Sequence, residues 1–315
     1  MLIAKSSSKR WIERAMKEFR YSTTGQWLKG NTHIHSTASD GRKTFSELAE
    51  LYASAGYDFL FRTDHWVLSD VAADKETYPL LWLDGTEIDG HDETGAWFHV
   101  VCLGPVRGVT RQTGFATALE VARDQGALLI AAHPHWCGNS LDDCLRWRFH
   151  GVEIYNHVCH WLNGKSNGLV HWDAILRSNP NALAFAVDDA HLGPEHPGWN
   201  GGWIVVNIEN NTRQDIMSAI RHGNFYSSCG PEIRSIEFDG DKLSMTTSPI
   251  RFMRLVGPDS NGKRAGSFDG PLLTSVNMSV PDDWRYAYVE IEDTAGRRAW
   301  TNNLFIDKKL SNNLL

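Results

Sequence analysis

The sequence predicts an α/β fold, either a barrel or a doubly wound sheet, followed by a small antiparallel β module. Up to about residue 229, short apolar runs alternate with helix-like stretches, which is typical of parallel βαβ units. The runs are almost continuously apolar, as expected of strands that helices cover on both faces. After residue 230 the runs become short and alternating, and DG, GP and AG turns separate them, which is typical of antiparallel strands.

Residues 1–30 are predicted to form an N-terminal extension. Between residues 9 and 20, apolar side chains recur at every third or fourth position among charged ones, so we expect a short amphipathic helix there. The extension precedes the main domain, which we place at residues 31–229.

The main domain alternates expected strands and helices. Its first helix is expected over residues 44–56, where Thr44 and Glu47 can form a capping box. Later helices are expected over residues 113–126 and 212–223. The apolar runs expected to form strands lie at 58–65, 78–89, 96–104, 127–135, 151–156 and 182–191. Residues 230–315 are assigned to a separate antiparallel β domain.

The composition excludes several classes of function. With 31 Lys and Arg against 38 Asp and Glu, the net charge is -7, so a nucleic-acid partner is not expected. No apolar run approaches the roughly 18 residues that a membrane-spanning helix needs, and the first 20 residues lack a signal-peptide core. The five cysteines lack C-x-x-C spacing, which favours a reducing cytoplasm over an oxidising compartment. A homo-oligomer stays possible.

Histidines and acidic residues follow the apolar runs rather than precede them. His33 and His35 flank Ile34, so in an extended chain both imidazoles face the same side. The carboxyl ends of parallel strands meet at one crevice, so the side chains that follow the strands are expected to share a pocket. Such a pocket needs a cation to offset the cost of burying ionisable groups. The other groups with this placement are Asp40, Asp64, His65, Glu87, His99, His133, His135, Asp188, Asp189 and His191.

These motifs, taken in order, resemble those of the PHP (polymerase and histidinol phosphatase) superfamily over roughly residues 31–195. The motifs are HIHSTASDG at 33–41, RTDH at 62–65, TEIDG at 86–90, AAHPH at 131–135, GVEIYN at 151–156 and DDAH at 188–191. The resemblance implies a distorted (β/α)7 barrel with two or three divalent metals at its mouth. The segment at 219–233 resembles the junction to a C-terminal β-sandwich in some phosphoesterases and carbamate hydrolases.

The resemblance also implies which residues bind the metals. It assigns His33, His35, Glu87 and Asp189 to the first metal, Glu87, His99 and His133 to the second, and Asp40, His65 and His191 to the third. All of these donors are imidazoles or carboxylates, which suits Zn, Mn or Fe. Asp189 is preferred over Asp188 because residues two apart, such as Asp189 and His191, can face the same side.

Three further residues are candidates for catalysis. Asp64 is expected to orient His65 or to relay protons. His135 is expected to support the ligands or to contact the substrate rather than to bind a metal directly, and either residue could serve as a proton donor. Arg62, if it points inward, can bind a phosphate oxygen with two N–H groups. Several residues stay open between a role in the site and a structural role: Glu153, Asn156, Trp66, Trp136, Trp161 and Trp199.

This set of residues predicts a metal-dependent hydrolase acting on a small-molecule substrate. The first hypothesis is a phosphoesterase, in which a metal-bridging hydroxide attacks a phosphate ester. The same hydroxide can attack a carbonyl carbon, so hydrolysis of a carbamate or a carboxylic ester is the alternative. A catalytically silent metal-binding scaffold is an alternative of another class.

Overall fold

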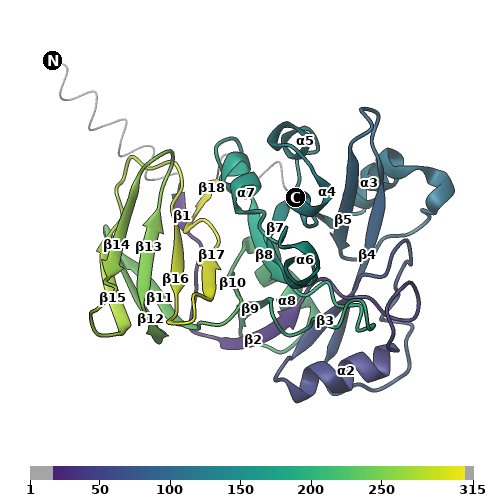
Figure 1. Cartoon of the computed structure of the whole chain (residues 1–315), viewed down its shortest axis with the longest axis horizontal. Helices are drawn as coiled ribbons and strands as arrows, with labels where there is room; N and C mark the ends of the chain where they lie inside the picture. Colours follow the sequence, from purple (N-terminus) through teal and green to yellow (C-terminus); the bar gives the residue numbers. More distant parts are fainter. Residues whose placement is uncertain (1–16, 309–315) are drawn as a thin grey trace.

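The computed structural model describes residues 17–308, which form a mixed α/β fold around one long sheet (Figure 1). Its 13 strands are, in hydrogen-bonded order, β14 (Gly262–Gly266), β13 (Phe252–Val256), β16 (Tyr288–Glu292), β17 (Arg298–Thr301), β10 (Phe225–Ser228), β9 (Trp203–Ile208), β2 (Gln26–Asn31), β3 (Phe59–Arg62), β4 (Leu81–His91), β5 (Trp97–Leu103), β6 (Leu128–Ala131), β7 (Gly151–Asn156) and β8 (Leu183–Val187). The smaller sheets contain β11 (Ile233–Asp239), β12 (Lys242–Ile250) and β15 (Leu273–Ser279), and β1 (Lys17–Phe19) with β18 (Phe305–Asp307).

Three helices lie where the sequence predicts them in the main domain, α2 (Phe45–Ser54), α3 (Phe115–Asp124) and α8 (Arg213–His222). Several short helices were not predicted, namely α4 (Pro134–Cys137), α5 (Leu141–Arg146), α6 (His157–Asn163) and α7 (Leu169–Leu176), with a 3-10 turn η1 (Arg111–Thr113). The capping box of Thr44 and Glu47 at the start of α2 is confirmed. Within residues 17–308, no helix combines the length and the apolar character that a membrane crossing requires.

The strands of the main domain are only partly parallel, which corrects the expectation of uniform βαβ units. The β2–β3–β4 and β6–β7–β8 pairs are parallel, whereas β4–β5, β5–β6 and β2–β9 are antiparallel. The link between β4 and β5, residues 92–96, is too short for a crossover, which needs about a dozen residues. A hairpin is the connection that so short a link permits.

The predicted (β/α)7 barrel is not confirmed, because the long sheet is open in the described residues and ends at β8. The chain just beyond β8 nevertheless returns to the chain just beyond β2, where Ile34 and Ala190 form an isolated parallel bridge. Around this bridge, the Asp189 N–H donates to the His33 carbonyl (2.9 Å) and the His35 N–H to the Ala190 carbonyl (3.0 Å). Two histidine-bearing segments distant in sequence are thereby fixed side by side.

The middle strands of the long sheet are buried on both faces, as their continuous apolar runs predict. In β3, Phe59 and Phe61 pack into a core with Phe185 of β8, while Leu60 faces the opposite side and packs with α2. Successive residues of a strand point to opposite faces, so a strand covered on both sides needs apolar residues at every position. Some ionisable side chains inside these strands, such as Glu87 in β4 and Glu153 in β7, are buried and belong to the site described below.

The C-terminal strands form antiparallel pairs, as predicted, but the long sheet does not stop at residue 229. β10 pairs with β17 on one side and with β9 on the other, so strands from both predicted domains belong to one sheet. The β11–β12–β15 sheet and the β13–β16–β17 strands share a separate apolar core. Figure 1 shows these strands at one end of the molecule and β4, β5 and α3 at the other.

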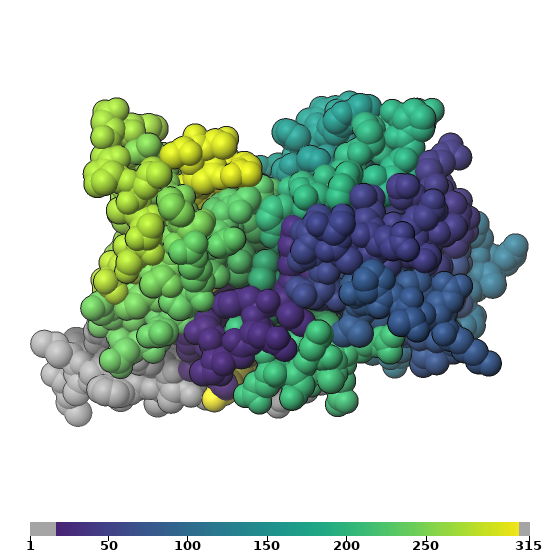
Figure 2. Space-filling model, turned by 90° about the horizontal axis from the view of Figure 1, so that it is seen from below, coloured from purple at the N-terminus to yellow at the C-terminus, as the bar shows by residue number. Residues whose placement is uncertain are grey.

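The helix expected over residues 9–20 lies mostly outside the described residues, and its last part, Lys17–Phe19, is strand β1. β1 pairs with β18 near the other end of the chain, and the Tyr21 hydroxyl donates to the Phe225 carbonyl (3.0 Å). In the space-filling view the dark purple N-terminal residues lie between the green strands and the blue segment around α2 (Figure 2). The described part of the extension thus pairs with strand β18 and contacts β10 in the middle of the long sheet.

A half-buried histidine makes the stability of this fold depend on pH. The imidazole of His150 accepts a hydrogen bond from the Leu129 N–H (2.9 Å), and burial, aided by Arg123 and Arg221, lowers its pKa to about 4. The unfolded chain binds this proton near pH 6.5 and the folded chain near pH 4, so this stability is present above pH 6.5 and is lost on acidification. On going from pH 7 to pH 4, the free energy of unfolding should fall less in His150→Asn than in the unaltered protein, by up to about 3 kcal/mol. Urea titrations of both proteins across that range measure the difference, and parallel curves would contradict it.

Candidate metal centre

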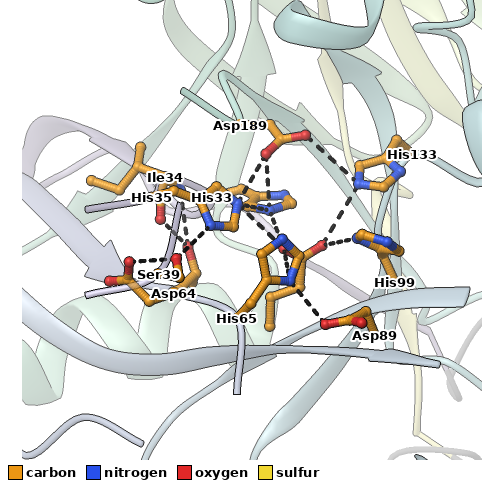
Figure 3. A network of polar contacts seen from close by, with 12 residues as sticks. His33, Ile34, His35, Ser39, Asp64, His65, Asp89, His99, His133 and Asp189 are labelled. Atoms are coloured by element: carbon orange, nitrogen blue, oxygen red, sulfur yellow. Dashed lines mark hydrogen bonds and ion pairs between the residues drawn. The ribbon is translucent and has the colours of Figure 1, made fainter. Parts of the chain in front are cut away.

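The nine predicted metal ligands come together at the carboxyl end of β2, β3, β6 and β8 and on the neighbouring strands β4 and β5. Figure 3 labels six of them, His33, His35, His65, His99, His133 and Asp189. His33 and His35 lie just beyond β2 with their Nε2 atoms 3.1 Å apart, whereas Ile34 between them packs on the other side with α2. The expectation that both imidazoles share one side is thus confirmed. Both side chains are fully buried.

The first group of donors is His33, His35 and Asp189. Asp189 Oδ1 lies 3.3 Å from His33 Nε2 and 3.1 Å from His35 Nε2. Glu87 Oε2 lies 3.2 and 3.3 Å from the same two nitrogens. The four residues that the resemblance assigns to one metal therefore surround one point.

Glu87 also joins the second group. Its Oε1 lies 2.8 Å from His99 Nδ1 and 3.6 Å from His133 Nε2, and Asp189 Oδ2 is 3.6 Å from the same His133 atom. Each of the two buried carboxylates thus turns one oxygen to the first group and the other towards His133. This is the placement expected of bridging carboxylates.

The third group lies on the more exposed side of the cluster. Asp40, whose side chain is 53% exposed, approaches His191 (3.2 Å), His35 (3.4 Å) and His65 (3.8 Å). Within this group and within each of the other three possible donor sets, the donor atoms lie within 4.8 Å of one another. His35 therefore reaches two groups, and His65 also reaches Glu87 and His99.

The charges of the cluster reinforce one another. Burial alone would raise the pKa of Glu87, but the imidazoles of His33, His65 and His99 outweigh it and hold that pKa well below its usual range. Burial likewise opposes charge on His35, yet hydrogen bonds to Asp189 and Glu87 raise its pKa to about 9. These shifts favour protonated imidazoles beside ionised carboxylates, so a metal bound here would compete with protons and would bind less tightly at low pH.

The donor set fits a divalent metal. His65 and His99 each present Nδ1 to Glu87, at 3.3 and 2.8 Å. Ionisable groups buried this close together are costly unless they are paired or bind a cation. The donors are nitrogen and oxygen atoms, as Zn, Mn and Fe accept.

Glu153 and Asn156, whose roles the sequence leaves open, hydrogen-bond to residues of the cluster. The His33 Nδ1–H donates to Glu153 Oε1 (2.6 Å), which leaves Nε2 of that ring facing the cluster. The other Glu153 oxygen accepts from the His133 N–H (2.9 Å), and Asn156 Nδ2 donates to both Glu153 and Asp189. The Glu153 carboxylate therefore holds both the His33 ring and the backbone of His133.

Asp89 and His196 are site residues that sequence reasoning missed. Asp89 Oδ1 lies 3.1 Å from His65 Nδ1, and the guanidinium of Arg111 holds the same carboxylate with bonds of 3.0 and 3.2 Å. The signal was available, because Asp89 is two residues beyond Glu87 on β4 and shares its face. His196 packs its ring 5.0 Å from that of His191, and no motif marks it.

The role predicted for Asp64 changes. Its carboxylate accepts hydrogen bonds from the Ser36 N–H (2.8 Å), the Ser36 hydroxyl (2.9 Å) and the Ser39 hydroxyl (2.8 Å). Asp64 thus positions the loop between His35 and Asp40 rather than orienting His65. It acts on the centre through that loop.

The catalytic roles predicted for Arg62 and His135 are not supported by their positions. Arg62 shares the face of Leu60, where its guanidinium pairs with Asp74 and lies 4.1 Å from the Phe45 ring centroid. His135 is exposed because α4 begins at Pro134 and turns the following residue away from His133. Neither side chain reaches the cluster.

A cavity of about 140 Å³ opens over the cluster. It is lined by Asp40, His65, Glu87, His99, His133, Trp136, Val158, Cys159, Leu162, Asp189, His191 and His196. Of the four tryptophans considered, only Trp136 is among these lining residues; Trp161 is exposed, and Trp66 and Trp199 pack against apolar cores. A larger groove of about 1080 Å³ between α3, α5 and α7 contains none of the predicted site residues.

Glu153→Ala is expected to weaken metal binding by about 10- to 100-fold, because it releases His33 and the His133 backbone together. Competition with a chromogenic chelator measures the affinity. Glu50→Ala, an exposed substitution on α2, serves as the matched control and should bind metal as the unaltered protein does. Equal affinities in all three proteins would show that Glu153 does not position the ligands.

Comparison with solved structures places this fold. A two-domain protein from Bacteroides vulgatus that contains a predicted PHP-like metal-dependent phosphoesterase superposes with a TM-score of 0.52, at 16% identity, covering 88% of this chain and 94% of that chain. The chain has a PHP-like fold. The resemblance seen in the motifs is thereby confirmed at the level of the fold, and at this identity the likeness extends to the fold alone.

Two further solved structures have TM-scores below 0.5, too low to support a conclusion about this fold. A protein from Bifidobacterium adolescentis, proposed to be a metal-dependent phosphoesterase, gives a TM-score of 0.41 at 15% identity over 62% of this chain and 96% of that one. An amidohydrolase from Chromobacterium violaceum gives 0.22 at 18% identity over 63% and 65%. No protein-family model and no curated protein matches the chain.

Proposed function

We propose that this PHP-like protein is a metal-dependent hydrolase that cleaves a phosphate ester. One observation carries the proposal: two buried carboxylates, Glu87 and Asp189, each lie between two groups of imidazoles at the floor of an open cavity. Packing alone does not explain such a cluster, because burying ionisable groups together is costly unless they are paired or bind a cation.

Nine residues of the cluster would bind cations, and the residues around them would orient these ligands. His33, His35, Glu87 and Asp189 would hold one metal, Glu87, His99 and His133 a second, and Asp40, His65 and His191 a third where three are bound. Bound divalent ions supply Lewis acidity and lower the pKa of bound water towards about 7.

The other residues of the centre orient these ligands. Glu153 fixes the ring of His33, and Asp64 fixes the loop that carries Asp40. Asp40 and His191 line the cavity at the most exposed edge of the cluster, so the substrate would approach past them. No side-chain nucleophile is required.

Hydrolysis of a carbamate or a carboxylic ester remains the second candidate, favoured by the apolar part of the cavity lining. Trp136, Val158 and Leu162 line the cavity, and no Lys or Arg is among the lining residues to meet a phosphate. Under the first candidate, the metals themselves must neutralise the phosphoryl oxygens.

The test is hydrolysis by protein loaded separately with Zn, Mn or Fe. We expect turnover of aryl phosphate monoesters that a chelator removes and that the metal restores. Turnover of aryl carbamates or carboxylic esters alone would replace the first candidate by the second. Tight binding of two or three metals without turnover of any of these esters would support the scaffold alternative.

We also propose the domain division and the compartment as the sequence predicts them. Residues 31–229 carry all nine proposed ligands, and residues 230–315 provide the strands β11 to β18. The proposed location is the cytoplasm, and the proposed partner is a small-molecule substrate.

A further inference from the structure

The cavity over the metal centre has two unlike walls. One wall consists of carboxylates and imidazoles of the cluster. The other wall comes from the two short helices α4 and α6 and consists of Trp136, Val158, Cys159 and Leu162. A substrate bound at the metals would therefore have an ionic side and an apolar side.

Trp136 is the best fixed part of the apolar wall. Its ring centroid lies 5.1 Å from that of His133 and 5.9 Å from that of His99, with interplanar angles of 85° and 80°. On another side it packs against Trp97, with centroids 5.3 Å apart. Because three rings hold it, the indole is a rigid surface beside the second ligand group.

The cavity offers no cation of its own to a second anionic group. Three carboxylates line it, and no Lys or Arg is among the lining residues. Arg111 is paired with Asp89, and Arg62 is paired with Asp74 on the α2 side of β3. Recognition of a further phosphate or carboxylate commonly uses a guanidinium or ammonium group, so substrates with two anionic groups would be poorly bound here.

The size of the cavity limits the leaving group. Its volume of about 140 Å³ is close to the roughly 150 Å³ of an apolar cavity that accepts a benzene ring. The phosphoryl group takes up part of this volume, so the leaving group that lies against Trp136 and Leu162 can be no larger than about one ring, and a nucleoside would have to extend out of the cavity.

From these observations we infer that the centre selects phosphate monoesters with an apolar leaving group of about one aromatic ring. The inference rests on the proposed hydrolase function and adds the substrate class to it. Trp136 and Leu162 are then the residues that determine specificity, since they contact the leaving group and not the phosphoryl group.

The test separates binding from turnover by using phosphonates, which are not hydrolysed. With the metal-loaded protein, phenylphosphonate should bind roughly tenfold or more tightly than methylphosphonate, since it buries one ring. Phosphonoacetate, with its second anionic group, should bind no better than methylphosphonate. Calorimetric titration measures all three.

Two variants test the wall itself. Trp136→Ala and Leu162→Ser should each reduce the preference for phenylphosphonate at least about threefold and leave methylphosphonate binding nearly unchanged. Trp161→Ala serves as the control, because this side chain is on the same helix as Leu162 but is 51% exposed and does not line the cavity. It should keep the full preference.

The outcomes distinguish this inference from the proposed function. Equal affinity for phenyl- and methylphosphonate, or tighter binding of phosphonoacetate, would overturn the inference even if phosphate esters are hydrolysed. A preference for phenylphosphonate that depends on Trp136, without turnover of any phosphate ester, would support the apolar wall and contradict the phosphoesterase. Loss of methylphosphonate binding in both wall variants would overturn the assignment of the wall to the leaving group.

Discussion

Asp189→Asn is expected to lower kcat/KM on the best phosphate ester by more than about 100-fold. Asp189 Oδ1 lies beside His33 and His35, and its Oδ2 faces His133, so the substitution removes a charge shared by two ligand groups. Loss of a residue that merely orients a ligand typically costs 10- to 100-fold, and loss of a ligand should cost more. His33→Ala should have a comparable effect.

The fold should survive Asp189→Asn. Asp189 has a φ of +56°, in the left-handed region that asparagine adopts more readily than most residues. The asparagine oxygen can still accept the hydrogen bond from Asn156. Elemental analysis, circular dichroism and steady-state kinetics on the metal-loaded proteins together measure the effect, with the exposed Asp142→Asn on α5 as the matched control. Turnover in Asp189→Asn equal to that of the control would refute the assignment of Asp189 to the metals.

The residues near His33 show what a sequence can and cannot predict about such a site. The alternation of side chains along an extended chain is a local property, so the shared side of His33 and His35 follows from their spacing. The partner that orients His33 is Glu153, 120 positions further along the chain. No local pattern links the two, because their contact depends on how β7 lies beside the chain after β2.

For both Arg62 and His135, the sequence contained a local signal that predicts the observed position. In β3 the period of two places Arg62 on the face of Leu60, towards α2 and away from Phe61, and the guanidinium does lie there. Pro134 at the first position of α4 is a helix-start signal, after which the strand period no longer applies. Extending the strand-end pattern by even one residue into a helix therefore misplaced His135.

The sheet illustrates the same difference. The β4–β5 hairpin follows from a link of residues 92–96 that is too short for a crossover, so it was predictable. The open edge at β8 was not, because closure would require hydrogen bonds between β8 and a strand far away in sequence. Apolar runs indicate that strands are buried but not which strands pair.

The second large effect is expected on stability, at the carboxylate next to Asp189. Asp188 is fully buried and accepts hydrogen bonds from two buried side chains, Asn31 Nδ2 (2.9 Å) and the Tyr52 hydroxyl (2.9 Å). It also accepts the backbone N–H groups of residues 200, 201 and 202 at 2.8, 2.7 and 3.0 Å. One carboxylate thus joins β2, α2 and the loop before β9.

Asp188→Ala should lower the free energy of unfolding by about 3–5 kcal/mol, because it leaves several buried donors without an acceptor. Urea titrations of the metal-free proteins measure this loss, and the exposed Asp142→Asn is the matched comparison, expected to stay within about 1 kcal/mol of the unaltered protein. The two adjacent aspartates then separate the two roles: one substitution removes turnover and keeps the fold, and the other weakens the fold. If Asp188→Ala unfolds at the same urea concentration as the unaltered protein, the five hydrogen bonds are not what holds β2, α2 and that loop together.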